Sequence, residues 1–477
     1  MKLRKFLLIS LAILVILALA AGFGIQQYRK YQDRFIMIDN VKYEKTTQVM
    51  DLSNRPLGDL EQLRQLPDLQ YLNLHGTGLD GKTYDTLRSW FPEAEIFWDI
   101  PFQGAFFPME TQELTITTLA EEDLEALAYF SQLKTVNAQD CRDYAALDLL
   151  RQARTDLDVR YTLSLVGTEY AIDTRELVIS GMETEALAAV LPYFTDLQKV
   201  ELVTPLAPVE DLVALMEMAP ETEFTWNLEL GGIPVNEKTE TLDLTNIPMT
   251  VEEMDAVLPY LLNLTRVEMT GCGISNEEMD ALNLRYENIK IVWTVRIGWR
   301  DYKTDIDAFM PARDGMTTVY NSYLYNLRYC HDVIALDIGH MEVTDISFVA
   351  YMPHLKFLLL GDTRVSDLSP LEGLTELVYL ELFMTNITEC DALLTLTALE
   401  DLNVSYTYCD AEVLSQMTWL KNLWWAKPTT LGWALLPDAL ANTHLEFNTF
   451  SSTGNGWRDL PNYFAQRDIF GLGYMTG

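Results

Sequence analysis

Cysteine and histidine, which build many metal and catalytic sites, are scarce in this sequence. Each occurs only five times in 477 residues. The cysteines form no C-x-x-C pair, and their odd number and wide spacing indicate neither a zinc site nor a disulfide framework. We expect Cys141 and Cys272 to be small buried hydrophobic residues. No H-E-x-x-H or G-x-S-x-G motif is present, so we assign no catalytic residue, no metal ligand and no cofactor.

Positive charge is also scarce. Lys and Arg total 34 against 70 Asp and Glu, which gives a net charge of −36 and a pI near 4.4. A surface of this sign repels phosphate groups and therefore argues against a nucleic acid partner. It fits a well-solvated surface or a basic protein or peptide partner. So many carboxylates form chance pairs that no glycosidase-type dyad can be located.

A long uncharged run stands at the N-terminus. The run from Phe6 to Ile25 lies between Lys5 and Arg29, and about 20 apolar residues span a bilayer as a helix. A cleavable signal peptide has a shorter apolar region, so we predict a retained transmembrane signal-anchor over residues 6–25. Residues 1–5 would be a cytoplasmic tip, residues 26–40 a juxtamembrane stem, and the acidic bulk extracytoplasmic at the cell membrane. Cleavage near Ala20 and secretion remain the alternative.

A 22-residue period runs through residues 333–447. Leu336, Leu358, Leu380 and Leu402 each begin an apolar-x-apolar triplet and lie 22 residues apart. Leu423 and Leu445 continue the series at steps of 21 and 22. A threonine follows three residues after the closing apolar position in three of the repeats, at Thr363, Thr385 and Thr407. Such a fixed period is the signature of a solenoid.

These repeats, with VTDIS at 343–347 and VSDLS at 365–369, resemble the internalin-type leucine-rich repeats of bacterial surface proteins. The resemblance implies an α/β solenoid with a parallel β-sheet on its concave side and short helices or 3-10 turns on its convex side. That family usually has an inward asparagine after the strand, whereas this chain has Thr, Cys or Met. We expect the threonine hydroxyls to satisfy the turn backbone instead.

Residues 41–298 have a longer period. Similar phrases begin at positions 47, 111, 174 and 239, at steps of 64, 63 and 65 residues. Each block contains two leucine-rich coils and a third, aromatic strand that ends near a glycine; the aromatic residues are Trp98, Tyr161, Trp226 and Trp293. Segments 121–130 and 251–262 have apolar residues at helical spacing and predict outer helices. The region therefore predicts four degenerate three-coil blocks.

Twelve strands in the blocks and six in the terminal repeats predict one elongated solenoid of 18 coils, about 85 Å long. An insert at residues 299–332 interrupts it, and residues 448–477 follow it as a C-terminal cap. Both segments carry the phrase GWRD, at 298–301 and 456–459. They can be caps over exposed solenoid ends or a shared binding epitope.

The middle residue of each strand triplet is expected to point outward onto the concave face. These residues are largely acidic or amide-bearing and form the candidate binding face: Asp51, Asn73, Asp99, Asn137, Glu201, Asn227, Asp243, Glu268, Asp337, Glu381, Asn403, Trp424 and Glu446. The face is either merely solvated or a groove for a protein or peptide, with a basic one favoured by the charge. Of Trp424 and Trp425, one should point outward, as a contact patch or as core filling.

The prediction from sequence is a membrane-anchored, extracytoplasmic leucine-rich repeat protein that is not an enzyme and recognises another macromolecule by its concave face. The first alternative is a structural spacer or assembly scaffold without a groove ligand. The second is an enzyme that acts on cell-wall polymers. The oligomeric state is left open.

Overall fold

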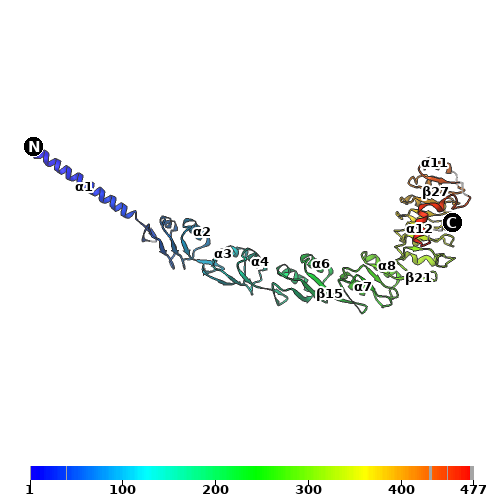
Figure 1. The fold of residues 1–477 in the computed structure, drawn as a ribbon, viewed down its shortest axis with the longest axis horizontal. Coiled ribbons are helices and arrows are strands. Elements are labelled where there is room, and N and C mark those ends of the chain that lie inside the picture. Colours follow the sequence, from blue (N-terminus) through cyan, green and yellow to red (C-terminus); the bar gives the residue numbers. More distant parts are fainter. Residues whose placement is uncertain (1, 39, 429–431, 448–449, 473–477) are drawn as a thin grey trace. The chain divides into compact units, whose positions relative to one another are not determined.

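A computed structural model describes residues 2–38, 40–428, 432–447 and 450–472 (Figure 1). The chain divides into two compact units, Met1–Thr225 and Trp226–Gly477. The expected positions 448–449 and 473–477 of the C-terminal cap lie outside the described residues.

The N-terminal run is helical. The helix α1 (Lys2–Gln32) begins before the predicted span and continues through much of the predicted stem. Its portion Ile9–Gln32 is long and apolar enough to cross a membrane. A short antiparallel hairpin follows, formed by β1 (Phe35–Ile38) and β2 (Val41–Glu44), and Ile36 and Ile38 of this hairpin are buried.

Each of the four predicted blocks contributes three parallel strands. The first two sheets, in the first unit, consist of β3 (Val49–Asp51), β4 (Tyr71–Asn73), β5 (Glu95–Phe97), and of β8 (Glu113–Thr115), β9 (Thr135–Asn137), β10 (Asp158–Arg160). The third contains β13 (Glu176–Ser180), β14 (Lys199–Val203) and β15 (Glu223–Leu230), and the boundary between the units falls within β15. The fourth, in the second unit, contains β17 (Thr241–Asp243), β18 (Arg266–Glu268) and β19 (Lys290–Val292).

No hairpin was predicted after the aromatic third strand, but the structure has one there. The strand leads into an antiparallel hairpin in every block: β6 (Asp99–Phe102) with β7 (Ala105–Pro108), β11 (Thr162–Leu165) with β12 (Thr168–Ala171), β15 with β16 (Ile233–Asn236), and β20 (Thr294–Ile297) with β21 (Arg300–Lys303). The glycines stand at the hairpin turns because these turns need positive φ, as at Gly104 (78°) and Gly167 (79°). The parallel sheet is therefore interrupted at each hairpin, and the assumption that all 18 predicted coils stack as parallel neighbours is wrong.

Short helices connect the strands of the blocks. They are η1 (Leu60–Gln65), α2 (Gly81–Trp90), α3 (Glu121–Leu127), α4 (Tyr144–Ala153), α5 (Thr184–Val190), η2 (Leu191–Tyr193), α6 (Val209–Met218), α7 (Val251–Val257), η3 (Leu258–Tyr260) and α8 (Asn276–Arg285). The two outer helices expected from apolar spacing are α3 and α7. Capping boxes begin α7 and α8, where Thr250 pairs with Glu253 and Ser275 with Glu278.

The terminal repeats form one seven-stranded parallel sheet. Its strands are β22 (Ala308–Phe309), β23 (Ala335–Asp337), β24 (Phe357–Leu359), β25 (Tyr379–Glu381), β26 (Asp401–Asn403), β27 (Asn422–Trp424) and β28 (His444–Glu446). The register pairs Leu336 with Leu358, Leu358 with Leu380 and Leu380 with Leu402, as the 22-residue period predicts. The seventh strand, β22, comes from the predicted insert, which also contains α9 (Asn321–Leu324) and η4 (Tyr325–Tyr329).

The turns that follow these strands are closed by threonine. The hydroxyls of Thr363, Thr385 and Thr407 donate to the carbonyl oxygens of Leu360, Leu382 and Val404, at 2.7, 2.6 and 2.6 Å. Short helices cover the convex side: η5 (Ser347–Tyr351), η6 (Ser369–Leu371), η7 (Asp391–Thr395), α10 (Ala411–Leu414), η8 (Trp433–Leu435) and α11 (Leu436–Ala439). The expectation that threonine replaces the usual asparagine is confirmed.

The cysteines behave in two ways. Cys141 and Cys272 are buried and free, as expected, and so is Cys330. Cys390 and Cys409 form a disulfide between neighbouring coils of the terminal sheet, which the sequence argument did not assign. The spacing gave no signal for this bond, because the two residues become neighbours only when the coils stack.

Candidate recognition surfaces

The outward side chains of the four blocks are open to solvent. Among the predicted binding residues, Asp51, Asn227 and Asp243 are exposed. The half-buried ones are Asn73, Asp99, Asn137, Glu201 and Glu268. Exposed valines lie beside these polar groups, among them Val178, whose exposed fraction is 62%.

Many of the predicted acidic and amide residues close the turn after their strand. The Asp51 carboxylate accepts the backbone N–H of Ser53 at 2.9 Å, and Asp243 accepts that of Thr245 at 2.9 Å. The side-chain oxygens of Asn73, Asn137, Asp337 and Asn403 accept the N–H two residues later in the same way. Hydrogen bonds from the side chain and backbone of Ser53 hold the pKa of Asp51 below its usual range. These short polar side chains therefore stabilise the turn, and their exposure on the strand face is only one reason for their polarity.

Asp99 is not a strand-centre residue. It begins the hairpin strand β6, and its carboxylate contacts His75 Nδ1 at 2.7 Å and accepts the backbone N–H of Gly76 at 2.6 Å. Its placement on the concave face was wrong, because the hairpin after β5 changes the direction of the chain. Asn227 likewise lies where β15 pairs antiparallel with β16.

The concave face of the terminal sheet is covered by the C-terminal segment, residues 456–472, which contains η9 (Trp457–Asp459) and α12 (Pro461–Ile469) (Figure 1). Glu381, Asn403 and Trp424 point outward from the sheet, yet their exposed fractions are only 2%, 0% and 2%. The prediction that these three residues form an open binding face is wrong. Glu446 and Asp337 are half-buried.

Aromatic packing and one ion pair hold the segment on the sheet. The Trp457 ring lies 5.0 Å from the Tyr379 ring and 5.3 Å from the Trp424 ring, measured between centroids. Glu381 accepts hydrogen bonds from Trp457 Nε1 and from Arg458 Nη1, both at 2.7 Å. Trp424 is thus core of this interface, and Trp425 points into the solenoid interior, where it is fully buried.

A small polar cavity of about 280 Å³ remains between the terminal sheet and the C-terminal segment. Asp337, Glu381, Arg458 and Gln466 are among its lining residues. The pKa of Asp337 is raised to about 6, mainly by burial and also by the neighbouring Glu381, while the Gly339 N–H, Arg458 and His340 act in the opposite direction. Ionisation of Asp337 therefore costs more free energy in this cavity than it does in water.

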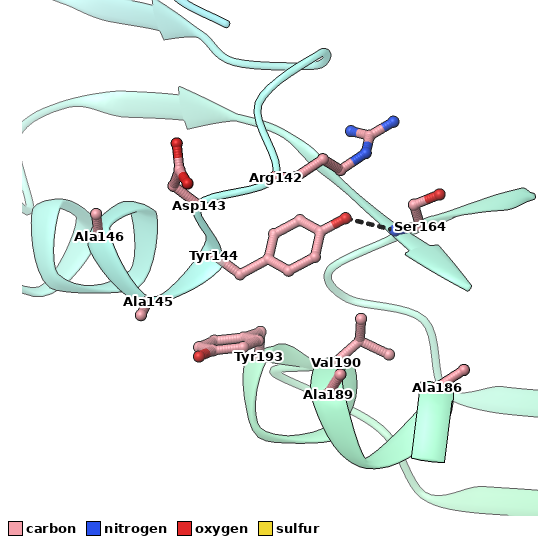
Figure 2. A pocket seen from close by; sticks show the side chains of 10 residues that line it. All are labelled: Arg142, Asp143, Tyr144, Ala145, Ala146, Ser164, Ala186, Ala189, Val190 and Tyr193. Atoms are coloured by element: carbon pink, nitrogen blue, oxygen red, sulfur yellow. Dashed lines mark hydrogen bonds between the residues drawn. The ribbon is translucent and has the colours of Figure 1, made fainter. Parts of the chain in front are cut away.

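A larger opening of about 670 Å³ lies on the helical side of the first unit (Figure 2). Arg142, Asp143 and Tyr144 line one side, at the start of α4. Val190 and Tyr193 line the other side, at the end of α5 and in η2. Sequence reasoning missed this opening because it considered only the strand faces. Within the described residues, no group of three or more His, Cys, Asp or Glu side chains is arranged to hold a metal ion.

The register, the parallel sheets and the convex helices define a leucine-rich repeat fold. No protein-family model matches the sequence. No curated protein matches it either.

Several solved leucine-rich repeat structures resemble the chain. An internalin, InlF, of Listeria monocytogenes is 13% identical, with 86% of this chain and 91% of that chain covered and a TM-score of 0.27. A leucine-rich repeat protein of Leptospira interrogans is 14% identical over 84% and 96%, with a TM-score of 0.26. The functional domain of InlJ of Listeria monocytogenes is 12% identical over 87% and 59%, with a TM-score of 0.22. These similarities carry no inference about function.

Proposed function

We propose that the protein is a membrane-anchored, extracytoplasmic leucine-rich repeat protein that recognises another protein or peptide, of basic character, through the open strand faces of its blocks. The observation that carries the proposal is the contrast between two kinds of strand face. The chain covers the concave face of the terminal sheet with its own segment, whereas the outward side chains of the blocks are left accessible. Accessible carboxylates beside exposed valines suit a partner of opposite charge.

The anchor rests on the helix α1. Its apolar portion is as long as a bilayer span requires, and basic residues flank it at both ends. An acidic chain held at a membrane in this way would present its strand faces to partners outside the cell.

Charge reversal on the open faces tests the proposal. Glu113, Glu176 and Glu201 lie on the outward faces of the second and third sheets and have no turn-closing bond. Replacing all three with lysine in the full chain, Glu113→Lys, Glu176→Lys and Glu201→Lys, should weaken a basic partner's affinity at least about tenfold, because like charges across an interface repel. The measurement is quantitative capture of surface proteins from native membranes by the detergent-solubilised chain.

The matched control carries the same change in net charge outside the strand faces. Glu125, Glu217 and Glu221 are exposed and lie away from the strands, so their triple lysine variant should retain the partner. Equal loss in both variants would show that net charge alone acts and would contradict recognition by the strand faces.

A spacer or scaffold is the second candidate. Two observations favour it: the turn-closing role of several predicted binding residues, and the occupation of the terminal groove by the chain itself. A spacer would bind no partner that either triple variant loses, so the same experiment separates the two functions. We propose no catalytic activity.

A further inference from the structure

The blocks repeat an aromatic pair where one block meets the next. The third-strand aromatic residue of one block is followed by a tyrosine just after the first α-helix of the next coil, in a turn or a 3-10 helix; the pairs are Trp98 and Tyr129, Tyr161 and Tyr193, Trp226 and Tyr260, and Trp293 and Tyr329. Because the pairs occupy equivalent places, the junctions within one unit can be compared with each other.

At the first junction the place that corresponds to this opening is filled, although a separate opening of about 750 Å³, lined by residues that include Tyr84 and Gln132, lies beside it. The Tyr129 ring lies over Gly81, the first residue of α2, so closely that a Cβ on Gly81 would be 2.8 Å from the ring. Tyr129 also packs edge-on against Trp98 at 5.5 Å, and its hydroxyl donates to Asp85 at 2.8 Å. This hydrogen bond is the main cause that raises the pKa of Tyr129 to about 12.

The second junction is open. Tyr144 is the first residue of α4 and stands where α2 has Gly81, so Tyr193 cannot take the place that Tyr129 takes. The rings of Tyr144 and Tyr193 instead lie 5.8 Å apart at 46° and border the opening of about 670 Å³. Figure 2 shows Tyr144 extended toward Ser164, whose N–H it accepts at 2.8 Å, with Tyr193 and Val190 across the gap.

Much of the lining is apolar, and its two charged side chains, Arg142 and Asp143, already have hydrogen-bond partners within the chain. Between the two tyrosines the wall consists of small side chains, namely Ala145, Ala146, Ala186, Ala189 and Val190. Arg142 donates to the carbonyl oxygens of Gln139 and Cys141 and pairs with Glu169. The Tyr144 hydroxyl accepts one bond and keeps its own proton for donation. The Tyr193 hydroxyl has no partner among the described residues.

The buried ring behind this arrangement is also unusual. Tyr161 stacks with Tyr144, at 6.4 Å between centroids, and its buried hydroxyl has no hydrogen-bond partner in the described part of the chain. At the first junction the equivalent residue is Trp98. The second junction therefore carries the free-energy cost of an unpaired buried hydroxyl, which Trp98 does not impose at the first junction.

We propose that this opening, bordered by Tyr144 and Tyr193, binds a proline-rich segment in the polyproline II conformation, with basic residues at its flanks. Proline rings pack on aromatic side chains, and a polyproline II backbone offers carbonyl oxygens as acceptors for tyrosine hydroxyls. A sugar ring would need many free hydrogen-bond partners, whereas the alanines supply none and Arg142 and Asp143 are already bonded within the chain. The net charge of −36 attracts the basic flanks. The site lies on the helical side and is independent of the strand faces proposed above.

Fluorescence anisotropy of a labelled peptide, RRPPLPPLPRR, with the detergent-solubilised full chain tests this site. We expect saturable binding, and no comparable binding of RRAALAALARR, which has the same charge without proline. Tyr193→Ala should weaken the affinity about tenfold or more, as the loss of an aromatic anchor does. Tyr193→Phe, which keeps the ring, should lose less than Tyr193→Ala.

Two further variants use the internal comparison. Tyr144→Gly recreates the glycine of the first junction and removes one of the two rings, so it should abolish binding; because Tyr144 also packs on Tyr161 and bonds to Ser164, circular dichroism must show that the variant is folded. Tyr129→Phe changes the equivalent tyrosine of the closed junction and should leave binding unchanged. Equal affinity for the alanine peptide, insensitivity to Tyr193→Ala, or binding of an oligosaccharide in place of the peptide would overturn the proposal.

Discussion

Asp51, Asn73 and Asp243 each have two roles, because the centre of a strand is also two residues before a turn. Their short side chains reach back to the N–H of the turn, at 2.9, 3.1 and 2.9 Å. Glutamate at the same position, as at Glu201, is longer and makes no such bond in the structure described here. Aspartate and asparagine at strand centres therefore indicate a following turn that they stabilise. The glutamates are the better candidates for contact with a partner.

Asp337 supports a pH prediction at the residue scale. Its pKa is raised to about 6 in the folded chain, mainly by burial, against an ordinary value of 3.8. A carboxyl with a raised pKa stabilises the fold most when it is protonated, so its contribution is lost as the pH rises through about 6. Asp337→Asn, which keeps the acceptor for Gly339, should therefore stabilise the chain at pH 7 by up to about 3 kcal/mol.

The measurement is chemical denaturation of both proteins at pH 4 and pH 7. The difference between variant and parent should be small at pH 4, where Asp337 is already neutral. An equal difference at both pH values would mean that the charge of Asp337 does not control the effect.

At the scale of elements, the two GWRD phrases form different structures. Trp299 lies at the turn of the β20–β21 hairpin and is 52% exposed, whereas Trp457 is fully buried against the terminal sheet. The C-terminal segment covers the concave face, not the open end of the sheet where an end cap was expected. The same four residues therefore adopt different structures because each segment packs against different parts of the chain.

Removal of the buried tryptophan should release the segment. Trp457→Ala leaves a cavity between Tyr379 and Trp424 and deprives Glu381 of a donor, so we expect a loss of about 3–5 kcal/mol in the free energy of unfolding. Trp299→Ala, in the exposed phrase, should cost less than about 0.5 kcal/mol. Guanidinium chloride unfolding followed by circular dichroism measures both; similar losses would contradict the assignment.

At the scale of the whole molecule, burial is local along the chain. In the second unit one apolar cluster extends from Leu230 to Leu440, built from side chains of successive coils. Each coil depends on its neighbours for burial, as in other repeat proteins. In the first unit, the side chains of α1 from Ile9 to Tyr31 are exposed.

A fragment that begins at Phe35 tests the role of α1. Because the side chains of α1 from Ile9 to Gln32 are exposed, residues 35–477 should be soluble without detergent, rich in β-structure and elongated, whereas the full chain should partition into membranes. Small-angle scattering and membrane flotation measure these properties. A compact spherical particle, or a full chain that stays soluble without detergent, would contradict the prediction.

The repeat period, the strand register, the convex helices and the threonine-closed turns could be predicted from sequence. They follow from local spacing and from side chains that act within one coil. The tertiary structure alone decided three further features: the hairpins that interrupt the parallel sheet, the Cys390–Cys409 bond and the covering of Glu381, Asn403 and Trp424. Each joins residues whose closeness depends on how coils stack or how a distant segment folds back. The spacing of residues along the chain does not predict such contacts.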